Sequence, residues 1–206
     1  MRNTAEFRLN VFINCPFDSD YKPLFEATVF AVSIAGFTPR CALEAGDAGT
    51  FRLEKILTIL SECRYGIHDL SRTEPGAFGL PRFNMPFELG LDLACKKFSS
   101  GEQREKRLLI LDRSRFRYQK FLSDVAGQDI RDHGKSRRRV IVCVRDWLVS
   151  ESGRAEIPGG DYMYRRYLSF QRELPALCRK LRLHPEQLTF VDLSGTIFTW
   201  LEENEV

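Results

Sequence analysis

One stretch of the chain decides how the rest can fold: Arg82-Phe-Asn-Met-Pro-Phe-Glu-Leu-Gly-Leu-Asp-Leu-Ala-Cys-Lys-Lys-Phe98. It predicts a helix that begins after a long polar loop, residues 72–83, and that carries Glu88 in its first turn. Apolar side chains at helical spacing predict the buried stripe of this helix, which consists of Phe87, Leu91, Ala94, Cys95 and Phe98. Residues 64–70, just upstream, predict a strand. This part of the chain is therefore a strand, a polar loop and a helix, in that order.

Outward from this unit, strands and helices are predicted to alternate. Three further strands are expected, over residues 9–14, 37–43 and 107–112. Helical periodicity marks the segments between them, residues 22–35 and 53–60. Pro39 cannot donate to a strand ladder, so its strand is assigned to an edge of the sheet. The alternation predicts a doubly wound α/β sheet of four or five mainly parallel strands.

The C-terminal part of the chain gives a less uniform pattern. Residues 118–125 predict a helix, and residues 140–144 fit a strand and a helix equally well. Helical spacing from Met163 onward predicts a long helix, which Pro175 would kink. Thr189-Phe-Val-Asp192 predicts a capping box that opens a final helix.

Length and composition place the chain among globular proteins. Its 206 residues are 43% hydrophobic and 29% charged, which is enough apolar material for one sizeable core. We assign residues 1–115 to an α/β core. Residues 116–206 are assigned to a mostly helical C-terminal part that packs on the same domain.

Charge and cysteine usage restrict the class of partner. The net charge of +3 is small for a dedicated nucleic-acid-binding protein, and the run Arg137–Arg139 is typical of a solvated edge. The six cysteines are scattered without a CxxC pair, which favours a reducing cytoplasm over a disulfide framework or a zinc site. No signal-peptide pattern and no apolar run of the ~18 residues that a membrane span needs are present. We expect a cytoplasmic protein that binds neither membranes nor nucleic acid.

Three polar segments are expected to meet at one edge of the sheet. Ligands of open parallel sheets bind outside the carboxyl ends of the strands, where residues 14–20, 69–72 and 84–88 should converge. The glycine-rich loop 44–50 can approach from the side. No GxGxxG motif follows the first strand and no GxxxxGK[ST] motif occurs, so neither dehydrogenase-type dinucleotide binding nor P-loop chemistry is expected.

Glu88 is the candidate catalytic residue of this edge. An ionised carboxylate can stabilise or attack the positively charged anomeric carbon that forms when an N-glycosidic bond breaks. The same spacing has a plainer interpretation, because Glu88, Asp92 and Lys96 lie at i, i+4 and i+8, as on a solvated helix face. Both interpretations remain open at the level of spacing.

The other polar candidates are equally ambiguous. Asp69 fits a ligand contact and also a residue that ends a strand. His68 fits packing or the surface better than a general base. His133 and His184 are isolated in the sequence, and no Ser-His-Asp or Cys-His set is predicted.

Three pieces of the sequence together resemble a known superfamily. They are Ile67-His-Asp-Leu-Ser71, Arg82-Phe-Asn-Met-Pro-Phe-Glu-Leu-Gly-Leu91 and Arg107-Leu-Leu-Ile-Leu111. The pattern is similar to that of bacterial TIR-like domains and relatives of the nucleoside 2-deoxyribosyltransferases. Val11-Phe-Ile-Asn-Cys-Pro-Phe-Asp18 is similar to the first strand and loop of the same superfamily. The resemblance extends over residues 8–112 and implies a flavodoxin-like fold that cleaves or transfers N-glycosidic bonds.

The resemblance also implies roles for particular residues. In TIR enzymes the substrate is NAD, and the catalytic glutamate corresponds to Glu88. We therefore expect an NAD glycohydrolase that takes NAD as its substrate and needs neither a cofactor nor a metal. Many bacterial members of the TIR-like branch are antiphage effectors that deplete NAD, so the resemblance implies a role in antiphage defence. The residues expected to hold or line the substrate are Pro16, Phe17, Asp18, Asp69, Ser71 and Asn84.

One departure from the pattern separates the two branches of the superfamily. The deoxyribosyltransferases carry an Asp-x-Gly-Thr lead-in where this chain has Arg82, and no Gly-Thr follows. This favours the TIR-like branch, whose members commonly act as assemblies, so homo-oligomers are expected by analogy. Two alternatives stay open: a nucleoside or nucleotide N-glycosidase or deoxyribosyltransferase, and a non-catalytic nucleotide-sensing or assembly module.

Overall fold

The fold is built on a five-stranded parallel sheet. The computed structural model describes residues 4–44, 46–73 and 82–204, so residues 74–81 of the predicted polar loop and residue 45 of the glycine-rich loop lie outside it. The strands are β1 Asn10–Asn14, β2 Thr38–Arg40, β3 Tyr65–Asp69, β4 Arg107–Asp112 and β5 Ile130–Asp132. They lie in the order β2-β1-β3-β4-β5, and every neighbouring pair is parallel. This is the order of flavodoxin-like doubly wound sheets, so the predicted fold class is confirmed.

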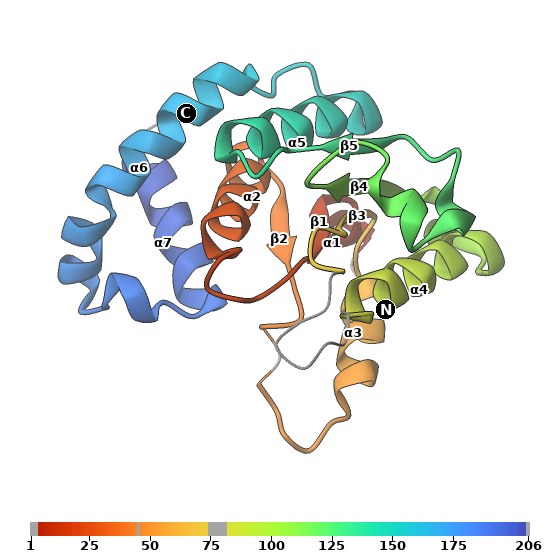
Figure 1. The fold of residues 1–206 in the computed structure, drawn as a ribbon. Helices are drawn as coiled ribbons and strands as arrows, with labels where there is room; N and C mark the ends of the chain where they lie inside the picture. The colour runs from red at the N-terminus through yellow and green to blue at the C-terminus, as the bar shows by residue number, and fades with distance from the viewer. Residues whose placement is uncertain (1–3, 45, 74–81, 205–206) are drawn as a thin grey trace.

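Helices cover both faces of the sheet (Figure 1). After the short α1 Thr4–Leu9, one face is covered by α2 Lys22–Ile34 and α5 Arg137–Ser152, and the other by α3 Arg52–Ser61 and α4 Asn84–Phe98. Outside α2 and α5 lie α6 Gly160–Leu181 and α7 Phe190–Glu203. Side chains of β1, α2, α5, α6 and α7 share one apolar cluster, so the C-terminal helices pack on the same core as the first strands. None of the helices in the described part of the chain has the length and apolar composition needed to cross a membrane.

The C-terminal part confirms one local prediction and corrects others. Thr189 and Asp192 form the predicted capping box: the Thr189 hydroxyl accepts from the Asp192 N–H at 3.1 Å, and the Asp192 carboxylate accepts from the Thr189 N–H at 3.0 Å. Residues 140–144 are helical. Ser136 caps the N-terminus of α5, and the apolar side chains of α5 are buried along one face of the helix. The predicted helix over residues 118–125 is wrong: two short 3-10 turns lie there instead. Helix α6 continues through Pro175.

Helix α4 packs with a different face from the one its apolar residues predict. Phe87 and Phe98 of the predicted stripe are 55% and 80% exposed. The buried residues are Met85, Glu88, Leu89 and Asp92, which follow each other at helical spacing. Two carboxylates are therefore part of the buried stripe, and the solvated-face interpretation is wrong. The helix also begins at Asn84, which places Glu88 in its second turn rather than its first.

The buried face of α4 is held by a fully buried ion pair. Asp92 is 0% exposed and lies 2.9 Å from the Lys106 ammonium and 3.0 Å from His68 Nε2. Burial raises the pKa of Asp92, but the hydrogen bond from His68 and the nearby Lys106 charge outweigh it and leave the pKa below its usual value. Lys106 is 0% exposed as well, although it ends the highly charged sequence Glu102-Gln-Arg-Glu-Lys106.

Lys106 also connects α4 to the end of α3. Its ammonium donates to the backbone carbonyls of Leu60 and Cys63 at 2.7 and 2.5 Å. These carbonyls lie at the C-terminal end of α3, where helices leave carbonyl groups without partners. Gly66 of β3 makes the room for this network, since a Cβ there would lie 2.4 Å from the Asp92 carboxylate.

We predict that Lys106→Met lowers the free energy of unfolding by about 3–5 kcal/mol, because it leaves Asp92 buried without its cation. Chemical denaturation followed by circular dichroism measures the change. Lys97→Met is the matched control, since Lys97 is an exposed lysine of α4 and its loss should change little. The double variant Asp92→Leu/Lys106→Met should recover much of the loss. Equal stability of Lys106→Met and the wild type would show that the ion pair does not hold the helix.

Candidate active site

The candidate site lies at the carboxyl ends of β1 and β3. The chain leaves these neighbouring strands toward opposite faces of the sheet, through α2 and α4, and ligands of such folds bind at this point. Cys15 follows β1 directly and is 4% exposed. Burial raises the pKa of its thiol well above the ordinary value, and the charges of Asp69 and Glu88 raise it further. The structure thus places both predicted carboxylates near the end of β1.

Glu88 is a buried carboxylic acid whose charge receives little stabilisation from the described residues. It is 6% exposed, and no other described residue donates a hydrogen bond to it or forms an ion pair with it. Burial raises its pKa to about 7, and Arg52 of α3 counteracts this only in part. A carboxyl with this pKa is present in both its protonated and its ionised form near neutral pH. A carboxyl group with this pKa can stabilise positive charge or exchange a proton under physiological conditions.

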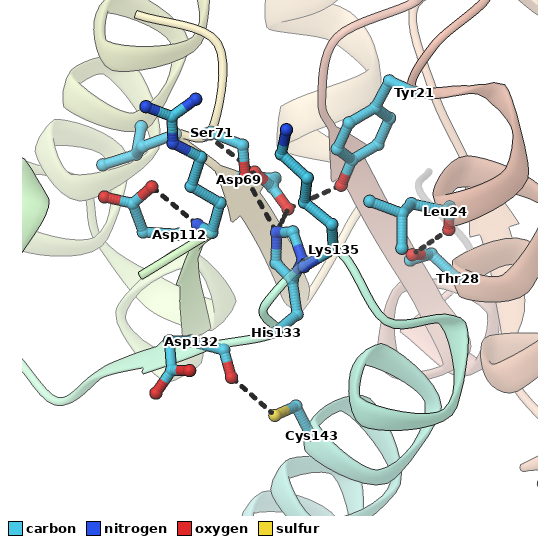
Figure 2. Close-up of polar contacts among 12 residues, drawn as sticks. Tyr21, Leu24, Thr28, Asp69, Ser71, Asp112, Asp132, His133, Lys135 and Cys143 are labelled. Atoms are coloured by element: carbon cyan, nitrogen blue, oxygen red, sulfur yellow. Dashed lines mark hydrogen bonds and ion pairs between the residues drawn. The ribbon is translucent and has the colours of Figure 1, made fainter. Parts of the chain in front are cut away.

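Asp69 is buried as well, but it has the opposite environment (Figure 2). It accepts hydrogen bonds from the Tyr21 hydroxyl at 2.5 Å, from the Ser71 N–H at 2.8 Å and from the Ser71 hydroxyl. His133 Nε2 lies 3.0 Å from Asp69 Oδ2, the oxygen that also accepts from the Tyr21 hydroxyl. Burial raises the pKa of Asp69, and the hydrogen bonds from His133, Ser71 and Tyr21 bring it below the usual value. Asp69 is therefore a fixed anion that positions its neighbours.

His133 corrects an expectation from the sequence. It is isolated in the sequence, but its fully buried ring lies beside Asp69, and Ser71 Oγ lies 2.8 Å from Nε2. Its Nδ1 accepts a hydrogen bond from the Lys135 N–H at 3.0 Å, so the ring proton is on Nε2. That nitrogen cannot accept the Ser71 proton as a general base. Ser, His and Asp thus meet here, but they do not form a nucleophilic triad.

The loop after β1 contributes to a different pocket. Pro16, Phe17 and Asp18 line a cavity of about 220 Å³ between α2 and the start of α7. Asp18 accepts from the Arg72 and Arg82 guanidinium groups at 3.1 and 3.2 Å, and it caps the Tyr21 N–H at 3.1 Å. Asp18 therefore holds two arginines that flank residues 74–81.

The remaining predicted residues divide between the surface and the interior. Asn84 is exposed at the start of α4, one turn before Glu88 and on the same side of the helix. Ser71 is 5% exposed and bound to Asp69. His68 is buried between Asn14 and Asp92, which agrees with the packing interpretation.

Several residues of this region carried no sequence signal. Tyr21, Lys106 and His133 each stand alone in the sequence. Tyr21 and His133 lie 48 and 64 positions from their partner Asp69. Lys106 lies 14 positions from its partner Asp92. Only the strand order brings such residues together. No group of three or more His, Cys, Asp or Glu side chains in the described ranges is arranged to hold a metal ion.

No family model, curated protein or solved structure matches this chain, and its function is therefore inferred from the site itself.

The raised pKa of Glu88 predicts a dependence of stability on pH. A carboxyl whose folded pKa lies near 7, above the ordinary 4.5, stabilises the fold fully below about pH 4.5 and loses this contribution as the pH rises through 7. Glu88→Gln removes the ionisation. Relative to the wild type, the variant should gain up to about 3 kcal/mol in unfolding free energy between about pH 4 and pH 8.

Urea denaturation of both proteins across this range measures the gain. The exposed Glu202→Gln removes a carboxylate from α7 and should follow the wild type at every pH. Parallel stability curves for Glu88→Gln and the wild type would contradict a buried, partnerless Glu88.

Proposed function

We propose that this protein is an NAD glycohydrolase that breaks the bond between nicotinamide and ribose, with Glu88 as its catalytic residue. The observation that carries the proposal is the burial of Glu88, without a hydrogen-bond or ion-pair partner among the described residues, at the carboxyl edge of a flavodoxin-like sheet. The resemblance of residues 8–112 to TIR-like domains supports the choice of NAD as the substrate.

The chemistry suits a single carboxylate. When the bond between the ribose C1′ and the nicotinamide nitrogen breaks, both electrons go to the nitrogen, and nicotinamide leaves as a neutral molecule without needing a proton. The positive charge then lies on the ribose, where a nearby anion stabilises or traps it. Water adds to C1′ and gives up a proton, which Glu88 can accept because its pKa lies near 7. Burial strengthens the attraction between the anion and the cation.

Other residues would hold the substrate in place. Asn84 is exposed one turn before Glu88, which suits a contact with ribose hydroxyls. Asp69 would act through the groups that it orients, since its oxygens already accept from Tyr21 and Ser71.

The position of Arg82 supports hydrolysis over deoxyribosyl transfer. Arg82 occupies the position at which the transferase pattern has an acidic residue. Its guanidinium lies 3.2 Å from the Asp18 carboxylate. An arginine held by Asp18 cannot replace that acid. As a TIR-like enzyme the protein would act in antiphage defence by depleting NAD, and as a homo-oligomer.

We predict that Glu88→Gln lowers the rate of nicotinamide release from NAD by about a hundredfold or more, because it removes the anion that stabilises the ribosyl cation. Wild-type turnover should rise with pH through about 7, as Glu88 ionises. Chromatography of released nicotinamide measures both, at protein concentrations that permit self-association. Glu202→Gln is the control and should retain wild-type turnover.

The same assay separates the alternatives. Release of a base from nucleosides or nucleotides, with NAD left intact, would indicate a nucleoside or nucleotide N-glycosidase. Ligand binding without turnover of any member of the panel would indicate a non-catalytic nucleotide-sensing module. Equal activity of Glu88→Gln and the wild type would exclude Glu88 as the catalytic residue.

A further inference from the structure

A second cavity at the carboxyl edge of the sheet is strongly basic. It has a volume of about 460 Å³ and lies on the side of the sheet covered by α2 and α5. Four cationic side chains line it, Arg72, Arg113, Lys135 and Arg137. Asp20 is the single carboxylate among the lining residues, so the lining carries an excess of three positive charges. Glu88 is not among the lining residues.

The inner wall of this basic pocket is formed by polar side chains. Ser71 and His133 form part of it, and both are buried. Nδ1 of His133 accepts a hydrogen bond from the Lys135 N–H at 3.0 Å, which fixes the orientation of the ring. Asp69 lies behind them, where Tyr21, Ser71 and His133 satisfy its oxygens. The negative charge nearest the wall is therefore already compensated within the protein.

The backbone is shaped to bring Lys135 to the pocket. Gly134 and Lys135 have φ values of 54° and 59°, in the left-handed region that a lysine rarely adopts. The turn is fixed by hydrogen bonds from the Gly134 N–H to Arg113 and from the Ser136 N–H to His133. Figure 2 shows the Lys135 side chain extending beyond His133 toward the space between Ser71 and Tyr21. Lys135 makes no ion pair with any described residue.

Two helices begin at the same place. Tyr21 precedes α2, and Arg137 is the first residue of α5, and both line the pocket. The positive ends of both helix dipoles add to the charge of the side chains. Burial and the neighbouring charges of Arg117 and Arg72 lower the pKa of Arg113, which reflects the crowding of cations here. An anion in the pocket would relieve this repulsion.

We propose that this basic pocket binds the phosphate or diphosphate group of a small soluble ligand. A phosphate carries close to two negative charges at neutral pH, and a diphosphate carries more, which matches an excess of three cations better than a single carboxylate does. Guanidinium groups also fit phosphate oxygens with two parallel hydrogen bonds. The proposal depends neither on Glu88 nor on the glycohydrolase reaction.

Isothermal titration calorimetry with inorganic pyrophosphate and with ADP tests this proposal. Lys135→Asn removes a pocket charge while retaining a residue type that tolerates the left-handed conformation. It should weaken both affinities about tenfold, the effect of one lost charge-assisted hydrogen bond. Lys135→Arg should stay near wild-type affinity. Raising the salt concentration should weaken binding to the wild type.

Arg182→Asn is the matched control. Arg182 is exposed, has a φ of 59° like Lys135, and does not line the basic pocket. It should bind pyrophosphate as the wild type does. Glu88→Gln should also bind normally, which separates a failure of this proposal from a failure of the proposed reaction.

Three results would overturn the proposal: no pyrophosphate or ADP binding by the wild type, equal weakening by Lys135→Asn and Arg182→Asn, or no weakening by Lys135→Asn. Binding to vesicles that contain phosphatidic acid, without binding to pyrophosphate or ADP, would overturn the assignment of a soluble ligand.

Discussion

The arrangement of this molecule depends on the buried contact between Asp92 and Lys106. Neither side chain is exposed, and together with His68 they join α4, β3 and the start of β4. Lys106 adds the C-terminal carbonyls of α3 to the same point. A helix held through a carboxylate must turn its polar stripe inward, and Glu88 lies on that stripe one turn earlier. The position of the candidate catalytic residue thus follows from a structural ion pair.

Three of the buried carboxylates, Asp92, Asp69 and Glu88, differ in their environments, and the differences assign their roles. Asp92 has a cation and a histidine, and Asp69 has a tyrosine, a serine and a histidine, so partners outweigh the effect of burial on both pKa values. Glu88 has no such partners among the described residues, and burial alone raises its pKa to about 7. Carboxyl groups whose pKa values differ in this way are typical of sites in which one acid reacts and the others hold the surrounding groups in place.

Local signals in the sequence predicted much of the fold. The strand at residues 107–112 and the capping box at Thr189 follow from apolar runs and capping chemistry, which act over a few residues. Strand β5 was missed because its three residues, Ile-Arg-Asp, lack an apolar run. The buried face of α4 was assigned wrongly, since spacing alone cannot tell a carboxylate paired with a distant lysine from a solvated one. His133 was missed because its partners lie more than sixty positions away.

The geometry of the sheet relates the two proposed sites to each other. Glu88 is on α4, on one face, whereas the basic pocket lies against α2 and α5, on the other. Cys15 and Asp69, at the ends of β1 and β3, lie between these faces. A ligand that used both sites would therefore have to cross the carboxyl edge of the sheet at the point where the connections diverge. NAD carries an N-glycosidic bond and a diphosphate in one molecule, so it has the two groups that such a ligand would need.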